Sequence, residues 1–194
     1  MKLSLDLTVK SSQEWIDAVL ADFDSFLQDH ADCERKASSM AMSFIAKAPE
    51  KIEIIPVLIE TAVEELEHFQ MVYKIMEERG VELAKEMYQD TYIKDLIKLC
   101  RHTPEERFLD RLMIASVVEC RGAERFKMVA DHIEDEEMKK FYKMLWTSEA
   151  KHGHIFVDMA LKYYPKDEVY KRLEFFNEEE GKIVDALPIR SALH

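Results

Sequence analysis

The chain has 194 residues, a hydrophobic fraction of 47% and a formal net charge of −12. A chain of this length fits one domain and can bury a substantial core, so we expect a single domain over residues 1–194. The strong negative charge argues against a broad nucleic-acid-binding surface, because such surfaces draw their non-specific affinity from Lys and Arg.

Cysteine usage and hydropathy indicate a soluble protein of a reducing compartment. The three cysteines, Cys33, Cys100 and Cys120, form no Cys-x-x-Cys motif and cannot all pair. No apolar run approaches the roughly eighteen residues that span a bilayer. The first twelve residues also lack the features of a secretory signal. We therefore expect a cytoplasmic protein without membrane attachment.

Composition predicts an all-α fold, because only 4 glycines and 5 prolines are present and helix-forming residues are abundant. In chain order, the predicted elements are a helix over 11–47 with a break near 21–24, a helix over 53–80, a connection with helical character over 81–102, helices over 103–131 and 135–164, and a packing helix with a short tail over 166–194.

Start and stop signals support these boundaries. Pro49 and Pro165 end two of the long helices, and Gly80 ends a third. Before the 103–131 helix, Thr103 offers a cap, followed by a proline at the first position and acids in the first turn.

Apolar residues recur at helical spacing in two segments. In the 53–80 helix, His68 lies at the margin of a face formed by Leu58, Ala62, Glu65, Leu66, Phe69, Val72 and Met76. Glu64 and Glu67 fall off that face and are expected in solvent. In the 81–102 connection, apolar residues also recur at helical spacing: Leu83, Met87, Ile93, Leu96, Ile97 and Leu99. A bundle with one long crossover between its second and third core helices needs such a segment.

Two copies of Glu-x-x-His stand out, Glu65 with His68 and Glu149 with His152. Positions three apart on a helix lie about one turn from each other, so each pair can direct a carboxylate and an imidazole to one point. A single such pair is more often a surface feature than a metal ligand. The two copies become informative because each has a partner upstream.

An inward Glu precedes each copy at nearly the same distance. Glu34 lies 31 positions before Glu65, and Glu119 lies 30 positions before Glu149. Ferritin-like four-helix bundles build dinuclear sites from one Glu on each of two helices and a Glu-x-x-His on each of the other two. The sequence therefore predicts a ferritin-like four-helix bundle with an extra C-terminal helix. It also predicts a dinuclear metal site, whose six ligands are Glu34, Glu65, His68, Glu119, Glu149 and His152.

Four carboxylates and two imidazoles suit iron, with manganese as a possibility, better than zinc. Four negative carboxylates offset two divalent cations, and six ligands leave positions open for oxygen. A metal-free bundle with vestigial ligands is the plain alternative, and it would require six inward polar residues to be satisfied by other means.

Weaker candidates lie beside the ligands. Asp29 or His30 could hydrogen-bond a ligand, although a partly exposed packing histidine is an equal interpretation for His30. His154 should point to solvent. Cys33 and Cys120 adjoin ligands in sequence, but adjacent helix positions diverge, so we assign them to packing.

The surrounding motifs resemble those of the bacterial tRNA 2-methylthio-isopentenyladenosine hydroxylases, the MiaE family. The resemblance covers roughly residues 27–156. It lies in Asp29-His30-Ala31-Asp32-Cys33-Glu34-Arg35-Lys36-Ala37, in Glu64-Glu65-x-x-His68-Phe69 with Arg79-Gly80, in Asp110-Arg111-Leu112 with Glu119-Cys120-Arg121-x-x-Glu124-Arg125-Phe126, and in Phe141-Tyr142 with Ser148-Glu149-x-x-His152.

The resemblance implies a di-iron monooxygenase with two iron ions, O2 as co-substrate and modified tRNA as substrate. Glu65 and Glu149 would bridge the metals, with Glu34 and Glu119 terminal. Two electrons would come from an external donor, because the chain has no flavin, dinucleotide or iron–sulfur motif. A monomer or small homo-oligomer is expected.

Three basic clusters could contact tRNA phosphates, although ordinary ion pairs are the favoured interpretation of each. They are Arg101, Arg107 and Arg111; Arg121, Arg125 and Lys127; and Lys139, Lys140 and Lys143. Alternative functions are a ferritin-like oxygenase with another substrate, and a ferroxidase or peroxide-scavenging iron protein.

Overall fold

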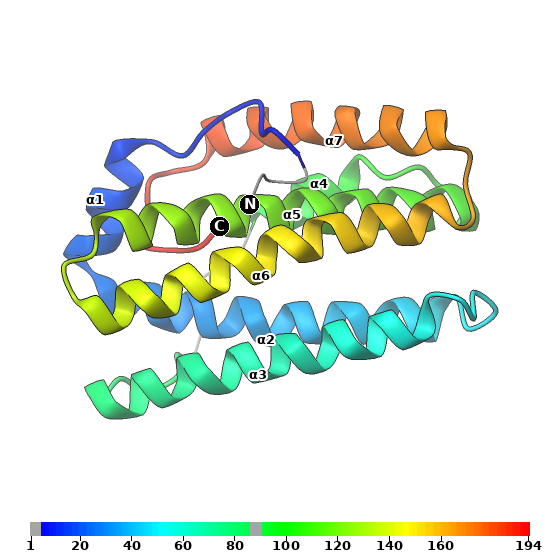
Figure 1. The fold of residues 1–194 in the computed structure, drawn as a ribbon. Coiled ribbons are helices and arrows are strands. Elements are labelled where there is room, and N and C mark those ends of the chain that lie inside the picture. The colour runs from blue at the N-terminus through cyan, green and yellow to red at the C-terminus, as the bar shows by residue number, and fades with distance from the viewer. Residues whose placement is uncertain (1–4, 86–90) are drawn as a thin grey trace. The chain divides into compact units, whose positions relative to one another are not determined.

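The structure is a computed structural model that describes residues 5–85 and 91–194. Every regular element in those residues is an α-helix, which confirms the predicted all-α class (Figure 1). In chain order the helices are α1 (Gln13–Ala21), α2 (Phe23–Lys47), α3 (Ile55–Arg79), α4 (Thr91–Lys98), α5 (Pro104–His132), α6 (Glu136–Leu161) and α7 (Lys166–Ala186). Among them, no helix is both long enough and apolar enough to cross a lipid bilayer.

The described residues form two compact units. The first, which we call the α5–α6 unit, contains residues 5–17, 91–189 and 194. The second, the α2–α3 unit, contains residues 18–85 and 190–193, and the boundary between the units falls within α1. Each unit contains one of the two repeats seen in the sequence.

In the α2–α3 unit, two long helices run side by side (Figure 1). The predicted break before α2 is confirmed, because the Asp22 carboxylate caps α2 by accepting a hydrogen bond from the Ser25 amide at 3.2 Å. Pro56 lies in the first turn of α3. Gly80 ends α3 at a φ of 70°, a left-handed conformation that costs glycine little.

The last residues of the chain are hydrogen-bonded to α2 and to its cap residue. Leu193 donates its amide hydrogen to the Asp29 carboxylate at 2.7 Å, and Ser191 donates its hydroxyl to the Asp22 carbonyl at 2.6 Å. Ala192 and Leu193 are buried. The predicted short tail after α7 is therefore confirmed, and it has fixed partners.

One residue was wrongly placed on the inner face of α3. Leu66 is 55% exposed, whereas Thr61 and His68 are buried. The buried face is centred nearer to His68 than the apolar pattern suggested. Leu66 then lies about 100° from its centre, which is outside the apolar stripe of a helix. His68 is buried at the edge of this face, as predicted.

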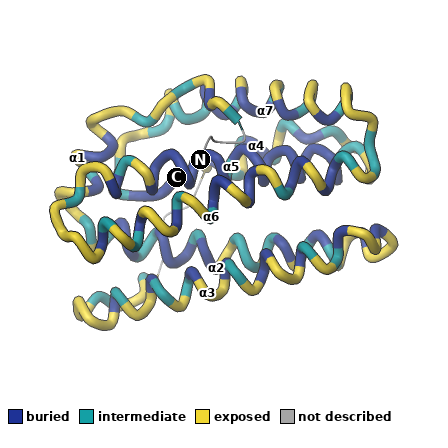
Figure 2. The backbone as a smooth tube through the Cα atoms, viewed as in Figure 1, coloured by how far each residue is buried: buried dark blue, intermediate teal, exposed yellow. Residues whose placement is uncertain are grey.

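In the α5–α6 unit, α5 is buried along most of its length (Figure 2). Its predicted start is confirmed, because Thr103 caps the helix by accepting from the Glu106 amide at 3.4 Å, with Pro104 next. Asp135 caps α6 by accepting from the amides of Glu137 and Met138. α7 packs against α5 in the same unit.

The segment between α3 and α5 is less helical than its pattern predicts. Its described helix is α4 alone, in which Tyr92 and Leu96 are buried. Leu83 lies outside any helix and is 44% exposed, so the helical pattern predicted to include it is wrong at this position. Met87, also part of the predicted pattern, lies outside the described residues.

Asp110 is a fully buried carboxylate on α5 with two cationic partners. Arg101 donates to it from its amide at 2.8 Å and from its guanidinium at 2.9 Å, and Arg172 donates at 2.8 and 3.0 Å. Burial alone would raise the pKa of Asp110. The hydrogen bonds from Arg101 and Arg172 outweigh burial and lower the pKa below its ordinary value of 3.8.

We expect this cluster to lose its stabilising effect in acid. Because the pKa of Asp110 is lower in the folded state than in the unfolded state, its contribution is fully present above about pH 4 and is lost as pH falls through the folded pKa. Urea unfolding of wild type and Asp110→Asn at several pH values tests this. The difference in unfolding free energy should shrink below pH 4, and a difference that stays constant into strong acid would contradict the assignment.

Candidate metal centre

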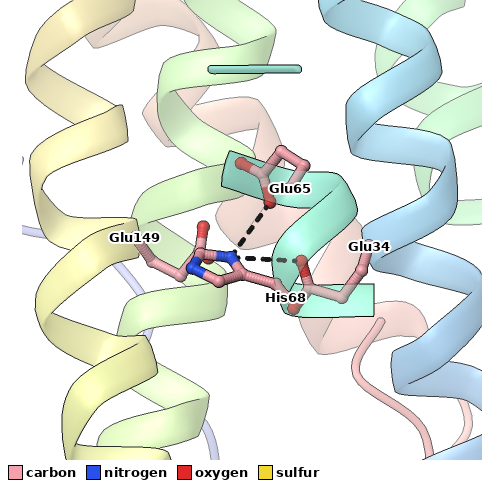
Figure 3. Close-up of side chains that lie close together, drawn as sticks. All are labelled: Glu34, Glu65, His68 and Glu149. Carbon is pink, nitrogen blue, oxygen red and sulfur yellow. Dashed lines mark hydrogen bonds and ion pairs between the residues drawn. The ribbon is translucent and has the colours of Figure 1, made fainter. Parts of the chain in front are cut away.

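The α2–α3 unit brings three predicted ligands together. Glu34 on α2 and Glu65 and His68 on α3 are all buried, and their polar ends point toward one another (Figure 3). His68 Nδ1 lies 3.4 Å from Glu65 Oε2 and 3.6 Å from Glu34 Oε2. Two carboxylate oxygens and one imidazole nitrogen thus converge from two helices.

A hydroxyl ties the two helices beside these ligands. Ser38, one turn after Glu34, donates to the Ala62 carbonyl of α3 at 2.7 Å, and Ala62 lies one turn before Glu65. This hydrogen bond fixes the register in which α2 and α3 present their carboxylates. The ligand positions therefore follow from helix geometry and one interhelical contact.

Of the two residues predicted as possible hydrogen-bond partners of a ligand, His30 contacts Glu34. His30 Nε2 lies 2.7 Å from Glu34 Oε1, and the ring is fully buried. Asp29 instead accepts the Leu193 amide of the tail. The alternative interpretation of His30, a partly exposed packing residue, is wrong.

The α5–α6 unit positions the other three predicted ligands, Glu119 on α5 and Glu149 and His152 on α6. All three are buried, and His152 Nδ1 lies 3.7 Å from Glu149 Oε2. Ser116, about one turn before Glu119, donates to the Gly153 carbonyl of α6 at 2.7 Å. A hydroxyl thus ties the ligand helices here too.

The side chain of Glu149 passes close to the α5 backbone. A methyl group added at Gly122 would lie 3.9 Å from Glu149 Cγ, which is ordinary van der Waals contact. The space beside Glu149 therefore does not require glycine at position 122, and alanine would also fit there.

The donor set of each unit fits a divalent transition metal. Two donor atoms that bind one ion at about 2.1 Å each are separated by roughly 3 to 3.5 Å, close to the separations within each Glu and His set. Carboxylate oxygens with a minority of imidazole suit iron or manganese. Burial without a metal would be costly for so many carboxylates. The buried Glu and His groups therefore fit iron binding.

His154 and Glu67 are exposed and Cys120 is buried, as predicted, and Cys33 is half-buried. Glu64, which was expected in solvent, is half-buried. None of these five was predicted as a ligand.

The basic clusters are largely engaged in ion pairs. Arg101 pairs with Asp110 and Glu168, and Lys127 pairs with Asp131. Lys139 pairs with Glu136 at 3.3 Å. The favoured interpretation, ion pairs within the protein, is confirmed for these residues, whereas Lys140 and Lys143 of α6 are exposed.

A buried network in the α5–α6 unit was not foreseen. Arg121 of α5 is fully buried and donates to both carboxylate oxygens of Glu180 on α7, at 2.7 and 2.8 Å. It also donates to Glu124 at 3.0 Å, and the Tyr92 hydroxyl donates to Glu180 at 3.0 Å. Glu180 ends a run of three glutamates, which suggests a solvated surface. Its helical spacing from Leu173 and Phe176 is the signal that could have placed it inside.

The chain is similar in sequence to known proteins. The chain is 33% identical over 172 residues to the tRNA 2-(methylsulfanyl)-N(6)-isopentenyladenosine(37) hydroxylase of Pseudomonas putida, covering 89% of this chain and 83% of that protein. It is 30% identical over 121 residues to the hydroxylase of the same name from Salmonella typhimurium, covering 62% of this chain and 44% of that protein.

A solved structure is also similar. It is a Synechococcus protein with aldehyde deformylating oxygenase activity, with a TM-score of 0.91 and 29% identity, covering 97% of this chain and 94% of that one. Together with the all-helical element order, this similarity confirms the predicted ferritin-like fold class.

The family predicted from the motifs is confirmed over nearly the whole chain. The model of the tRNA-(MS[2]IO[6]A)-hydroxylase (MiaE) family matches residues 3–194, which include every predicted ligand. The chain therefore belongs to the tRNA-(MS[2]IO[6]A)-hydroxylase (MiaE) family.

Proposed function

We propose that this protein uses one di-iron centre to hydroxylate the isopentenyl group of 2-methylthio-isopentenyladenosine in tRNA. The family assignment confirms the predicted enzyme class, a tRNA hydroxylase. The observation that carries the di-iron part is the same in each unit: two buried glutamates and a buried histidine on two adjacent helices. We propose a single domain over residues 1–194 in which the six predicted ligands, Glu34, Glu65, His68, Glu119, Glu149 and His152, share the two ions.

The ligands have distinct tasks in this proposal. Glu65 and Glu149 would bridge the two ions, and Glu34 and Glu119 would each hold one ion. Four carboxylates offset the charge of two divalent cations, so the reduced centre is nearly neutral. When bound, the iron pair supplies the activation of O2, and manganese is the alternative metal. Burial of the ligand residues keeps bulk water away from that chemistry.

The reaction also needs two partners, an electron donor and the tRNA. Insertion of one oxygen atom into a C–H bond with release of the other as water consumes two electrons, which we assign to an external donor. We place the exposed Lys140 and Lys143 of α6 on the path of the tRNA backbone, because exposed lysines can contact phosphates. We propose a cytoplasmic location and a monomer or small homo-oligomer.

A turnover assay read by mass spectrometry tests the proposal. Iron-loaded protein, a reductant and tRNA that carries the modified adenosine are incubated with isotopically labelled dioxygen, and the digested nucleosides are compared with reactions lacking enzyme or oxygen. The expected product is the adenosine heavier by one labelled oxygen atom. An unchanged nucleoside, with two irons bound and oxygen consumed, would overturn the substrate assignment.

The similar Synechococcus structure favours a second candidate, an oxygenase that acts on an aldehyde. Aldehydes added to the same assay decide between the two. Loss of aldehyde without change in the tRNA would favour the second candidate, and the reverse would favour the first. Oxygen consumption without either substrate reacting would instead favour the ferroxidase alternative.

A further inference from the structure

His30 is a fully buried titratable residue that the six-ligand proposal does not use. It lies on α2 one turn before Glu34, and its Nε2 is 2.7 Å from Glu34 Oε1. The ring also lies beside the buried ring of Phe26, with centroids 5.9 Å apart. His30 therefore has a fixed place and a short contact with a predicted ligand.

The chemistry of the two groups fixes the direction of this hydrogen bond. An ionised carboxylate has no hydrogen to donate, so the imidazole must donate from Nε2 to Glu34 Oε1. The other oxygen, Oε2, lies 3.6 Å from His68 Nδ1. One oxygen of Glu34 is thus held by His30, and the other faces the remaining ligands of the α2–α3 unit.

We propose that His30 is a positioning residue for Glu34, which it holds as a ligand through Oε2 alone. This inference rests on the proposed di-iron function. The hydrogen bond from His30 Nε2 to Glu34 Oε1 fixes the plane of the carboxylate. It thereby prevents Glu34 from rotating to bind one ion through both oxygens. The position that corresponds to His30 in the second repeat, four residues before Glu119, is Ala115, so the two repeats differ at this position.

Substitutions that separate hydrogen bonding from packing test the role of His30. His30→Leu keeps an apolar side chain beside Phe26 but removes the donor, whereas His30→Gln retains an N–H group at a similar reach. His154→Ala, on the exposed side of α6, is the matched control. For each variant, Fe²⁺ affinity is measured anaerobically against a chromophoric chelator, and the melting temperature reports folding.

We expect His30→Leu to weaken the binding of one Fe²⁺ by about 10- to 100-fold, the usual effect of removing a hydrogen-bond partner of a ligand. His30→Gln should recover most of that loss, and His154→Ala should bind as wild type does. A folded His30→Leu protein with wild-type affinity for both ions would overturn the inference. Wild type that binds no iron would overturn the proposed function, and the role of His30 with it.

A measurement on wild type covers the case in which His30→Leu does not fold. Long-range proton–nitrogen spectra of the histidine rings should place a slowly exchanging hydrogen on His30 Nε2. A hydrogen on Nδ1 alone, with Nε2 bare, would contradict the donation to Glu34.

Discussion

Replacing Glu65 with alanine is expected to abolish stable iron binding and, with it, hydroxylation. Glu65 is 1% exposed, and its Oε2 lies 3.4 Å from His68 Nδ1. Alanine removes both oxygens that we assign to bridging the two ions, so neither ion keeps its full donor set. Glu149→Ala, the equivalent change in the second repeat, should have the same effect. Iron content per chain after desalting measures the loss, from two in wild type to near zero.

The effect should also appear in stability without any activity assay. A ligand that binds only the folded state raises the unfolding free energy, by about 2.7 kcal/mol at 100 times its Kd. The melting temperature of wild type should therefore rise with added Fe²⁺, and that of Glu65→Ala should not. Glu67→Ala is the matched control, because Glu67 is exposed on the same helix. Two irons bound by Glu65→Ala would remove Glu65 from the ligand set.

The part of the site that could be predicted is the part governed by helix geometry. Glu65 and His68 lie one turn apart on any helix, so their convergence depends on local spacing alone. The capped starts of α2 and α5 and the glycine end of α3 are also local features, and each lies near its predicted place. The pairing of α2 with α3 and of α5 with α6 follows from their short connections.

What could not be predicted depends on contacts between residues distant in sequence. The Leu193 amide donates to Asp29, which lies 164 positions away in the sequence. The Arg121 guanidinium donates to Glu180, which lies 59 positions away. Helical spacing places Glu180 on the same face as Leu173 and Phe176, but no local pattern identifies Arg121 as its partner. Leu66 was misplaced for a related reason, because the centre of a buried helix face depends on the neighbouring helix and not on hydropathy alone.

Replacing Arg121 with methionine is expected to destabilise the protein by about 3–5 kcal/mol, the usual effect of removing one partner of a buried ion pair. Burial alone would lower the pKa of Arg121, but the hydrogen bonds and charge of Glu180 outweigh it and raise the pKa above its usual range. Arg121 is therefore charged at every accessible pH. Its loss would leave the Glu180 carboxylate, which is fully buried, without its main cationic partner. Urea unfolding followed by circular dichroism measures the change.

A double substitution separates the network from simple packing. Arg121→Met with Glu180→Leu removes both charges and replaces them with apolar groups, so it should recover much of the stability lost in Arg121→Met. The Tyr92 hydroxyl, which donates to Glu180, loses an acceptor in the double variant and limits the recovery. Arg121→Lys should recover little, because lysine cannot bind both oxygens of Glu180 at once.

The Arg121 variants also decide what the Arg121-x-x-Glu124-Arg125 motif contributes to the family. Arg125 donates to Ser11 at 3.0 Å and, like Arg121, is buried, so neither guanidinium is available to phosphate. The motif then joins α5 to α7 through Glu180 and to Ser11 before α1. The tRNA affinity of the folded double variant should therefore equal that of wild type at the same salt concentration. If Arg121→Met kept wild-type stability and lost tRNA affinity, the motif would belong to the tRNA interface and the buried network would not be what holds α7 to α5.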